Sequence, residues 1–117
     1  MNAPSPCFKL SRMVMNEHVP MDALRLEVSA SCFHLLSYHH LDSAKFESVK
    51  EQDALTISFL NHQVRIVGRN LRELAMAIQS RSVESIKPMP GRYSAAAGTE
   101  TGFVEAIEIE AAGGNSD

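Results

Sequence analysis

The feature that most constrains the fold is a two-residue alternation of apolar and polar positions between residues 55 and 66. In a β-strand, successive side chains point to opposite faces, so this alternation predicts strands with one buried face. The apolar positions of the pattern are Leu55, Ile57, Phe59, Val64 and Ile66. They predict two antiparallel strands that share one apolar face.

The connection between these two strands gives an expected register. We expect Asn61 and His62 to form a two-residue hairpin turn, because asparagine tolerates a positive φ. Such a turn sets Phe59 opposite Val64 and, on the same face, Ile57 opposite Ile66. The turn and the hydrophobic pattern therefore agree.

A third strand fits before this hairpin. If residues 50–53 form a four-residue loop, Phe46 lies opposite Ile57 and Ala44 lies opposite Phe59. Burying a Phe or Ile side chain contributes about 1.5–3 kcal/mol. The shared inner face of the three strands can therefore anchor a hydrophobic core.

An amphipathic helix is predicted over residues 71–80. Asn70 suits the N-cap position and Glu73 suits the third helical position. The apolar residues that recur at helical spacing are Leu71, Leu74, Ala75 and Ile78. The predicted fold is α+β: an antiparallel β-sheet meander with one amphipathic helix packed on one face.

The flanks of this core carry weaker patterns. Alternation over residues 22–32 predicts a strand with a bulge or turn after Cys32, and a helix over residues 22–36 is the competing interpretation. Residues 83–86 predict a short strand that Pro88 ends.

The composition divides the chain into five segments. A stretch rich in Pro, Gly and Ala is typical of a linker, and the strand that follows it can pair with its own sheet or with a neighbouring chain. The expected segments are a loose N-terminal leader at 1–21, a single core domain at 22–87, a linker at 88–102, an outlying strand at 103–110 and a frayed tail at 111–117.

The order of strand, hairpin and helix resembles a bacterial pleckstrin-homology-like domain. The residues that carry the resemblance are 41–46, 55–59, 64–68 and the helical Leu71, Leu74 and Ile78. The resemblance implies a binding or assembly module rather than an enzyme, and it assigns no ligand-binding residue.

Charge and motifs exclude several classes of function. The net charge of −3 and the pI of 5.9 argue against a nucleic-acid binder, which usually carries a basic excess. The apolar runs are far shorter than the roughly 20 residues of a membrane-spanning helix. The start lacks the pattern of a secretory signal, so we expect a cytoplasmic protein.

We expect no catalytic residue, metal or cofactor. The chain has no nucleophile motif of the G-x-S-x-G type. Cys32 and His34 share a face of a strand, but a zinc site needs at least three protein ligands.

One basic stretch is a candidate ligand site. Residues 61–87 hold five Lys or Arg and two Asp or Glu, a local charge of +3. A helix N-terminus favours anions, so a phosphate group or an acidic peptide is the expected ligand. The candidate residues are Arg65, Gly68, Arg69, Asn70 and Arg72. The competing interpretation is a solvated basic face.

Two classes of function therefore stay open. The first is a non-catalytic binding or self-assembly module, which associates through a sheet surface or through strand 103–110, because Leu60 and Val67 point away from the predicted helix. The second is a protein, an enzyme included, that handles an anionic or phosphate ligand at the helix N-terminus with the nearby arginines.

Overall fold

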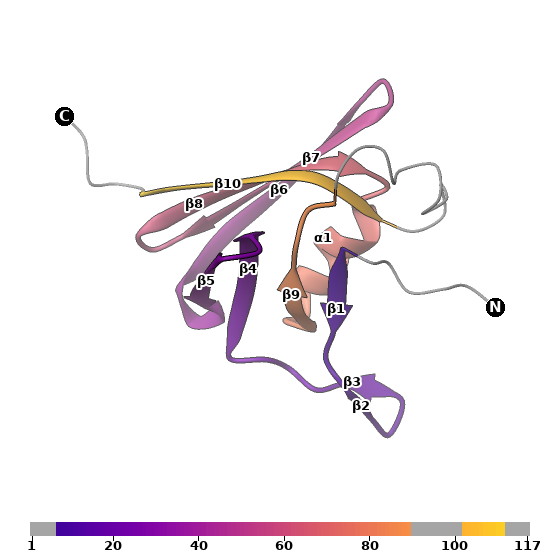
Figure 1. Ribbon diagram of the computed structural model, residues 1–117. Helices are drawn as coiled ribbons and strands as arrows, with labels where there is room; N and C mark the ends of the chain where they lie inside the picture. Colours follow the sequence, from indigo (N-terminus) through magenta and orange to yellow (C-terminus); the bar gives the residue numbers. More distant parts are fainter. Residues whose placement is uncertain (1–6, 90–101, 112–117) are drawn as a thin grey trace.

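A computed structural model describes residues 7–89 and 102–111 of the chain (Figure 1). The described residues form mostly antiparallel sheet with one α-helix, which confirms the α+β class. The elements are β1 (Phe8–Leu10), β2 (Met13–Val14), β3 (Glu17–His18), β4 (Ala23–Ser29), β5 (Cys32–Ser37), the 3-10 turn η1 (Tyr38–His40), β6 (Leu41–Val49), β7 (Gln52–Phe59), β8 (His62–Arg69), α1 (Arg72–Gln79), β9 (Val83–Ile86) and β10 (Phe103–Ala111).

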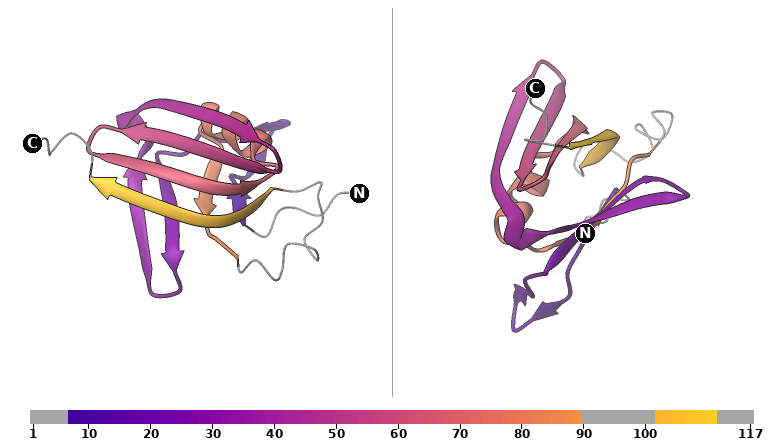
Figure 2. Two further views of the ribbon diagram at one scale, coloured as in Figure 1. Left: turned by 90° about the horizontal axis from the view of Figure 1, so that it is seen from above. Right: turned by 90° about the vertical axis from the view of Figure 1, so that its left-hand side faces the viewer.

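The predicted meander forms one of two four-stranded sheets. β6, β7 and β8 are consecutive antiparallel neighbours, and β10 pairs with β8, so the strand order is β10-β8-β7-β6 (Figure 2). The outlying strand predicted at 103–110 thus pairs with its own sheet. As expected, Ile107 and Ile109 pack against the core, whereas Glu108 and Glu110 are exposed.

The predicted faces are correct, but the register between β7 and β8 is wrong by two residues. Ile57 lies opposite Val64, and Ser58 opposite Gln63 is the last pair before the turn. Asn61 does not adopt a positive φ. The connection between β7 and β8 consists of Leu60 and Asn61, so the turn begins one residue earlier than expected.

The register between β6 and β7 differs in the same way. Phe46 lies opposite Leu55 and Ala44 lies opposite Ile57, so the turn consists of Lys50 and Glu51, with Lys50 at φ 57°. A shift of two residues leaves every side chain on its original face. Hydrophobic alternation therefore cannot distinguish the two registers.

The structure corrects the expectation of a loose leader for residues 7–21, the described part of the segment predicted at 1–21. The order of the second sheet is β1-β9-β4-β5, and β1 pairs with β9 although the two are far apart in sequence. β2 and β3 form a separate hairpin, and Cys7 and Ser11 are buried. The core is therefore not confined to residues 22–87. Strands of two or three residues are too short to show periodicity.

Other flanking predictions can be compared with the structure. β4 and β5 form a hairpin, so the helix over 22–36 is wrong, and the turn at Ala30 and Ser31 precedes Cys32. β9 forms the predicted strand at 83–86. Most of the linker and tail predictions concern residues outside the described part of the chain.

The core draws on both sheets and on α1. The strands of the two sheets cross one above the other, with α1 beside them (Figures 1 and 2). Leu24 and Leu26 of β4, together with Val83 and Ile86 of β9, join the buried cluster. The inner face of the meander, which the sequence assigns to the helix alone, thus also faces the second sheet. Leu74 and Ile78 of α1 are buried in the same cluster.

A Schellman motif ends α1. Arg81 lies in the left-handed region at φ 56°, and its N–H donates to the carbonyl of Ile78 at 3.0 Å. The N–H of Ser82 donates to the carbonyl of Ala77 at 3.0 Å. These two hydrogen bonds satisfy helix carbonyls that otherwise lack intrahelical donors.

Tyr38 lies in η1, the connection from β5 of one sheet to β6 of the other, and is expected to make stability depend on alkaline pH. Its hydroxyl donates a 2.8 Å hydrogen bond to the carbonyl of Val83, and only 4% of the residue is exposed. Burial raises the pKa of Tyr38 above its ordinary value of 10.0, and the Val83 hydrogen bond and the charge of Arg81 offset this only in part. Above about pH 10 the unfolded chain therefore releases a proton that the folded chain retains.

Folding stability should then fall by up to about 1.4 kcal/mol per pH unit through Tyr38. We expect Tyr38→Phe to remove this contribution, and to cost about 1 kcal/mol near pH 7 because the hydrogen bond is lost. Urea unfolding of both proteins from about pH 8 to pH 11 measures the difference. If the free energy of unfolding of both proteins fell equally with rising pH, Tyr38 would not be the group responsible.

Candidate functional site

The sequence-predicted residues surround the corner between β8 and α1, but they do not converge. Arg65 is exposed on β8, opposite Thr56 and Glu108, on the face directed away from the core. Four strand residues, about 13 Å, separate it from Arg69. Arg72 is exposed at the first position of α1.

Gly68 has a packing role. It is buried between β7 and β10, opposite Asp53 and Val104. A Cβ at this position would lie 1.9 Å from the carbonyl oxygen of Phe103. The absence of a side chain therefore lets the backbone of β10 lie close to β8, its antiparallel neighbour. Gly68 lies within a strand, not in a glycine-rich loop of the kind that binds phosphate.

Arg69 is engaged by the same strand. Its guanidinium Cζ lies 5.6 Å from the centroid of the Phe103 ring, which is a cation–π geometry. The Nε atom of Arg69 is buried and has no hydrogen-bond partner among the described groups. The described contact of this guanidinium is thus the one with Phe103 of β10.

The start of α1 is already occupied by a carboxylate of this chain. Asn70 lies in the left-handed region at φ 56° and is not the N-cap. Leu71 takes that position, and its own apolar side chain makes no capping hydrogen bond. Oδ2 of Asp53, on β7, accepts the N–H of Leu71 at 3.0 Å. The predicted N-cap is therefore wrong. Asp53 supplies the anion that the helix N-terminus favours.

Sequence reasoning missed Asp53, although a signal for it exists. Asp53 has the same strand parity as Leu55 and Ile57, so an acidic residue faces the core. Acidic residues are almost never buried without a partner. An inward-facing Asp next to a predicted helix therefore indicates a capping role.

A second candidate site is an open groove between β6 and α1. The groove has a volume of about 420 Å³. Leu41, Ala44 and Phe46 of β6 line it from one side, Leu55 of β7 contributes to it, and Ala75, Met76, Ile78 and Gln79 of α1 line it from the other side. Nearly all of these side chains are apolar.

The groove is open to solvent because the side chains that line it are small or only partly buried. Ala44 points to the inner face of the sheet yet is exposed, and Phe46 is only partly buried. Met76 is 57% exposed. Together these residues leave apolar surface in contact with solvent at one end of the sheet.

The backbone beside the groove is also available. β6 is the outermost strand of its sheet, so its outer side carries backbone N–H and C=O groups that no neighbouring strand in the described part of the chain pairs. An extended segment can add to such an edge through backbone hydrogen bonds, while alternate side chains enter an adjacent groove. The arrangement thus combines a hydrogen-bonding edge with an apolar receptacle.

Other chemistry has less support in the residues that the structure describes. Over 7–89 and 102–111, no three His, Cys, Asp or Glu side chains are grouped to hold a metal ion. No helix there has the length and apolar character needed to cross a membrane. Comparison with known protein families, curated proteins and solved structures finds no match to the chain.

Proposed function

We propose that the protein is a non-catalytic binding module that takes an extended peptide segment of a partner protein in the groove between β6 and α1. The observation that carries the proposal is the coincidence of an unpaired strand edge with an apolar, solvent-open groove. The same kind of role is implied by the resemblance to bacterial pleckstrin-homology-like domains.

The lining of the groove defines the chemistry of the segment. A strand added to β6 directs every second side chain toward the face that carries Ala44 and Phe46. The partner therefore presents apolar residues at alternate positions. These residues would cover Ala44, Phe46 and Met76.

The charge at one end of the groove favours an acidic residue in the partner. Arg72 precedes Met76 by four residues, so both lie on the same side of α1. Arg72 is exposed, and the described ion pairs leave its guanidinium uninvolved. An acidic side chain beyond the apolar pair would meet this guanidinium.

The alternative of a phosphate-handling protein has weaker support. Asp53 already accepts a hydrogen bond at the helix N-terminus, and Arg69 is stacked on Phe103. Arg65 lies on the outer face of the sheet. The groups that would bind an anion are thus dispersed or already engaged.

The proposal is tested by selection from a displayed library of random nine-residue peptides, followed by fluorescence anisotropy with the selected sequences. We expect selected peptides to carry alternating apolar residues and an acidic residue. Ala44→Lys should weaken their binding by at least about tenfold. Ser43→Lys is the matched control, because Ser43 is exposed on the same strand but points to the other face.

The outcomes separate the groove from the rest of the surface. Arg72→Glu should weaken binding of the acidic peptides while peptides with Lys in place of the acidic residue gain affinity. An unproductive selection, or equal effects of Ala44→Lys and Ser43→Lys, would contradict the proposal.

A further inference from the structure

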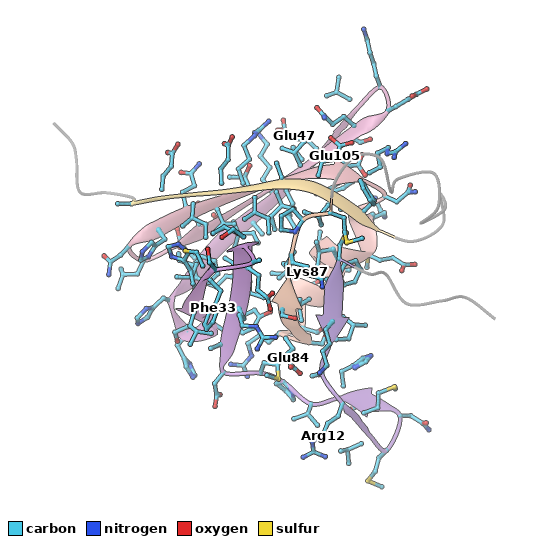
Figure 3. All side chains as sticks on the ribbon, in the orientation of Figure 1. Arg12, Phe33, Glu47, Glu84, Lys87 and Glu105 are labelled. Carbon is cyan, nitrogen blue, oxygen red and sulfur yellow. The ribbon has the colours of Figure 1, made fainter. Side chains whose placement is uncertain are left out.

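The outer strands of the two larger sheets differ in how they are protected against pairing with other chains. β10 carries Glu105, Glu108 and Glu110 (Figure 3 labels Glu105). β1 carries Lys9, whose Nζ lies 3.4 Å from Oε2 of Glu84. Charged side chains on an edge strand oppose edge-to-edge association.

β5 lacks this protection. It is the other outer strand of the β1-β9-β4-β5 sheet, and its residues Cys32–Ser37 include no Asp, Glu, Lys or Arg. Phe33 and Leu35, on the same face of the strand, are 57% and 64% exposed (Figure 3 labels Phe33). An uncharged edge with adjacent exposed apolar side chains is suited to pairing with another strand.

We propose that β5 pairs antiparallel with β5 of a second copy of this chain, about a two-fold axis that passes beside His34. In this register Phe33 of each copy lies opposite Leu35 of the other. The four side chains form one apolar cluster on a continuous eight-stranded sheet, since each copy contributes four strands. An axis beside Leu35 would instead set Phe33 opposite Ser37 and lose this match.

The charges next to β5 are complementary under the same axis. On β4, Arg25 lies opposite Leu35 and Glu27 lies opposite Phe33. Each row of side chains across the joined sheet therefore begins with Arg25 of one copy and ends with Glu27 of the other. Nε of Arg25 and Oε2 of Glu27 are 2.9 Å apart within each copy. The interface thus has an apolar centre, and each margin carries the Arg25–Glu27 pair of one copy, so the surface is self-complementary as an isologous interface requires.

This edge fits a second copy better than the surfaces expected from the sequence. The strand at 103–110 presents glutamates at its edge, and two copies of it would place like charges together. Val67, on the outer face of the other sheet, is partly buried between the alanines Ala54 and Ala106. β5 offers both apolar side chains and an uncharged edge.

Sedimentation velocity tests the proposal. We expect a concentration-dependent dimer of the full chain, and Leu35→Lys should raise the dimer Kd by at least about tenfold. Leu60→Lys is the matched control, because Leu60 is also 64% exposed but lies in the turn between β7 and β8. Thermal unfolding verifies that both variants are folded.

A crosslink tests the register separately. The double variant Cys32→Ser/His34→Cys places one introduced cysteine of each copy opposite the other across the two-fold axis. Opposite residues of an antiparallel pair have Cα atoms about 4.5–5.5 Å apart, which is within the range for a disulfide. We expect oxidation to give a covalent dimer. Three results would each overturn the proposal. They are a wild-type chain that stays monomeric up to about 1 mM, equal effects of Leu35→Lys and Leu60→Lys on the dimer Kd, and failure of the crosslink to form.

Discussion

Gly68→Ala is expected to lower the free energy of unfolding by about 3 kcal/mol, the upper end of the usual cost of overpacking. The added Cβ would lie 1.9 Å from the carbonyl oxygen of Phe103 and 2.9 Å from its carbonyl carbon. Both are backbone atoms, so no side-chain rotation relieves the clash. β10 would have to move away from β8, which would disturb the contact between Arg69 and Phe103.

Urea unfolding followed by circular dichroism measures the effect on stability. Gly102→Ala is the matched control, because the atom nearest to its added Cβ is Cε1 of Phe8 at 2.7 Å, the end of a side chain that can rotate. We expect it to cost about 1 kcal/mol. A Gly68→Ala protein as stable as the wild type would show that the backbone of β10 does not lie this close to Gly68 of β8.

The requirement for glycine at position 68 could not be predicted from the sequence, although the buried face of the strands could. Alternation of apolar residues correctly assigned Ile57, Phe59 and Val64 to one buried face, because burial depends only on side-chain parity. The need for glycine at position 68 arises from a strand that begins at Phe103. No local pattern connects two segments so far apart in the chain.

Anchoring by the N-terminal segment escaped prediction for a related reason. The Sγ atom of buried Cys7 accepts the N–H of Val104 at 3.1 Å, and the carbonyl of Cys7 accepts the N–H of Lys87 at 2.7 Å. One residue thus holds the ends of β9 and β10. Pro4 and Pro6 are typical of a loose leader. The sequence pattern around them therefore gives no indication that the next residue, Cys7, is buried.

The candidate site was predictable only in its components. Ala44 and Phe46 were assigned to the inner face, and the structure places them there. The groove exists because α1 leaves these two residues only partly covered, which depends on where the helix lies relative to the edge of the sheet. Periodicity indicates which side of a strand is apolar, whereas the placement of neighbouring elements decides how much of it is buried.

Asp53→Ala is expected to cost about 2–3 kcal/mol, because it removes the carboxylate that accepts the N–H of Leu71 at 3.0 Å. Asp53 is 9% exposed, so solvent can replace this acceptor only poorly. The lost carboxylate also interacts favourably with the helix N-terminus. Both terms act on the start of α1, and the measurements are urea unfolding and the helical signal in circular dichroism.

Asp53→Asn separates the two terms. The amide oxygen retains an acceptor for Leu71 while the negative charge is lost, so we expect a cost of about 1 kcal/mol or less. If Asp53→Ala and Asp53→Asn were equally destabilised, the charge rather than the hydrogen bond would fix the helix start. If neither variant lost stability, the carboxylate of Asp53 would not cap α1.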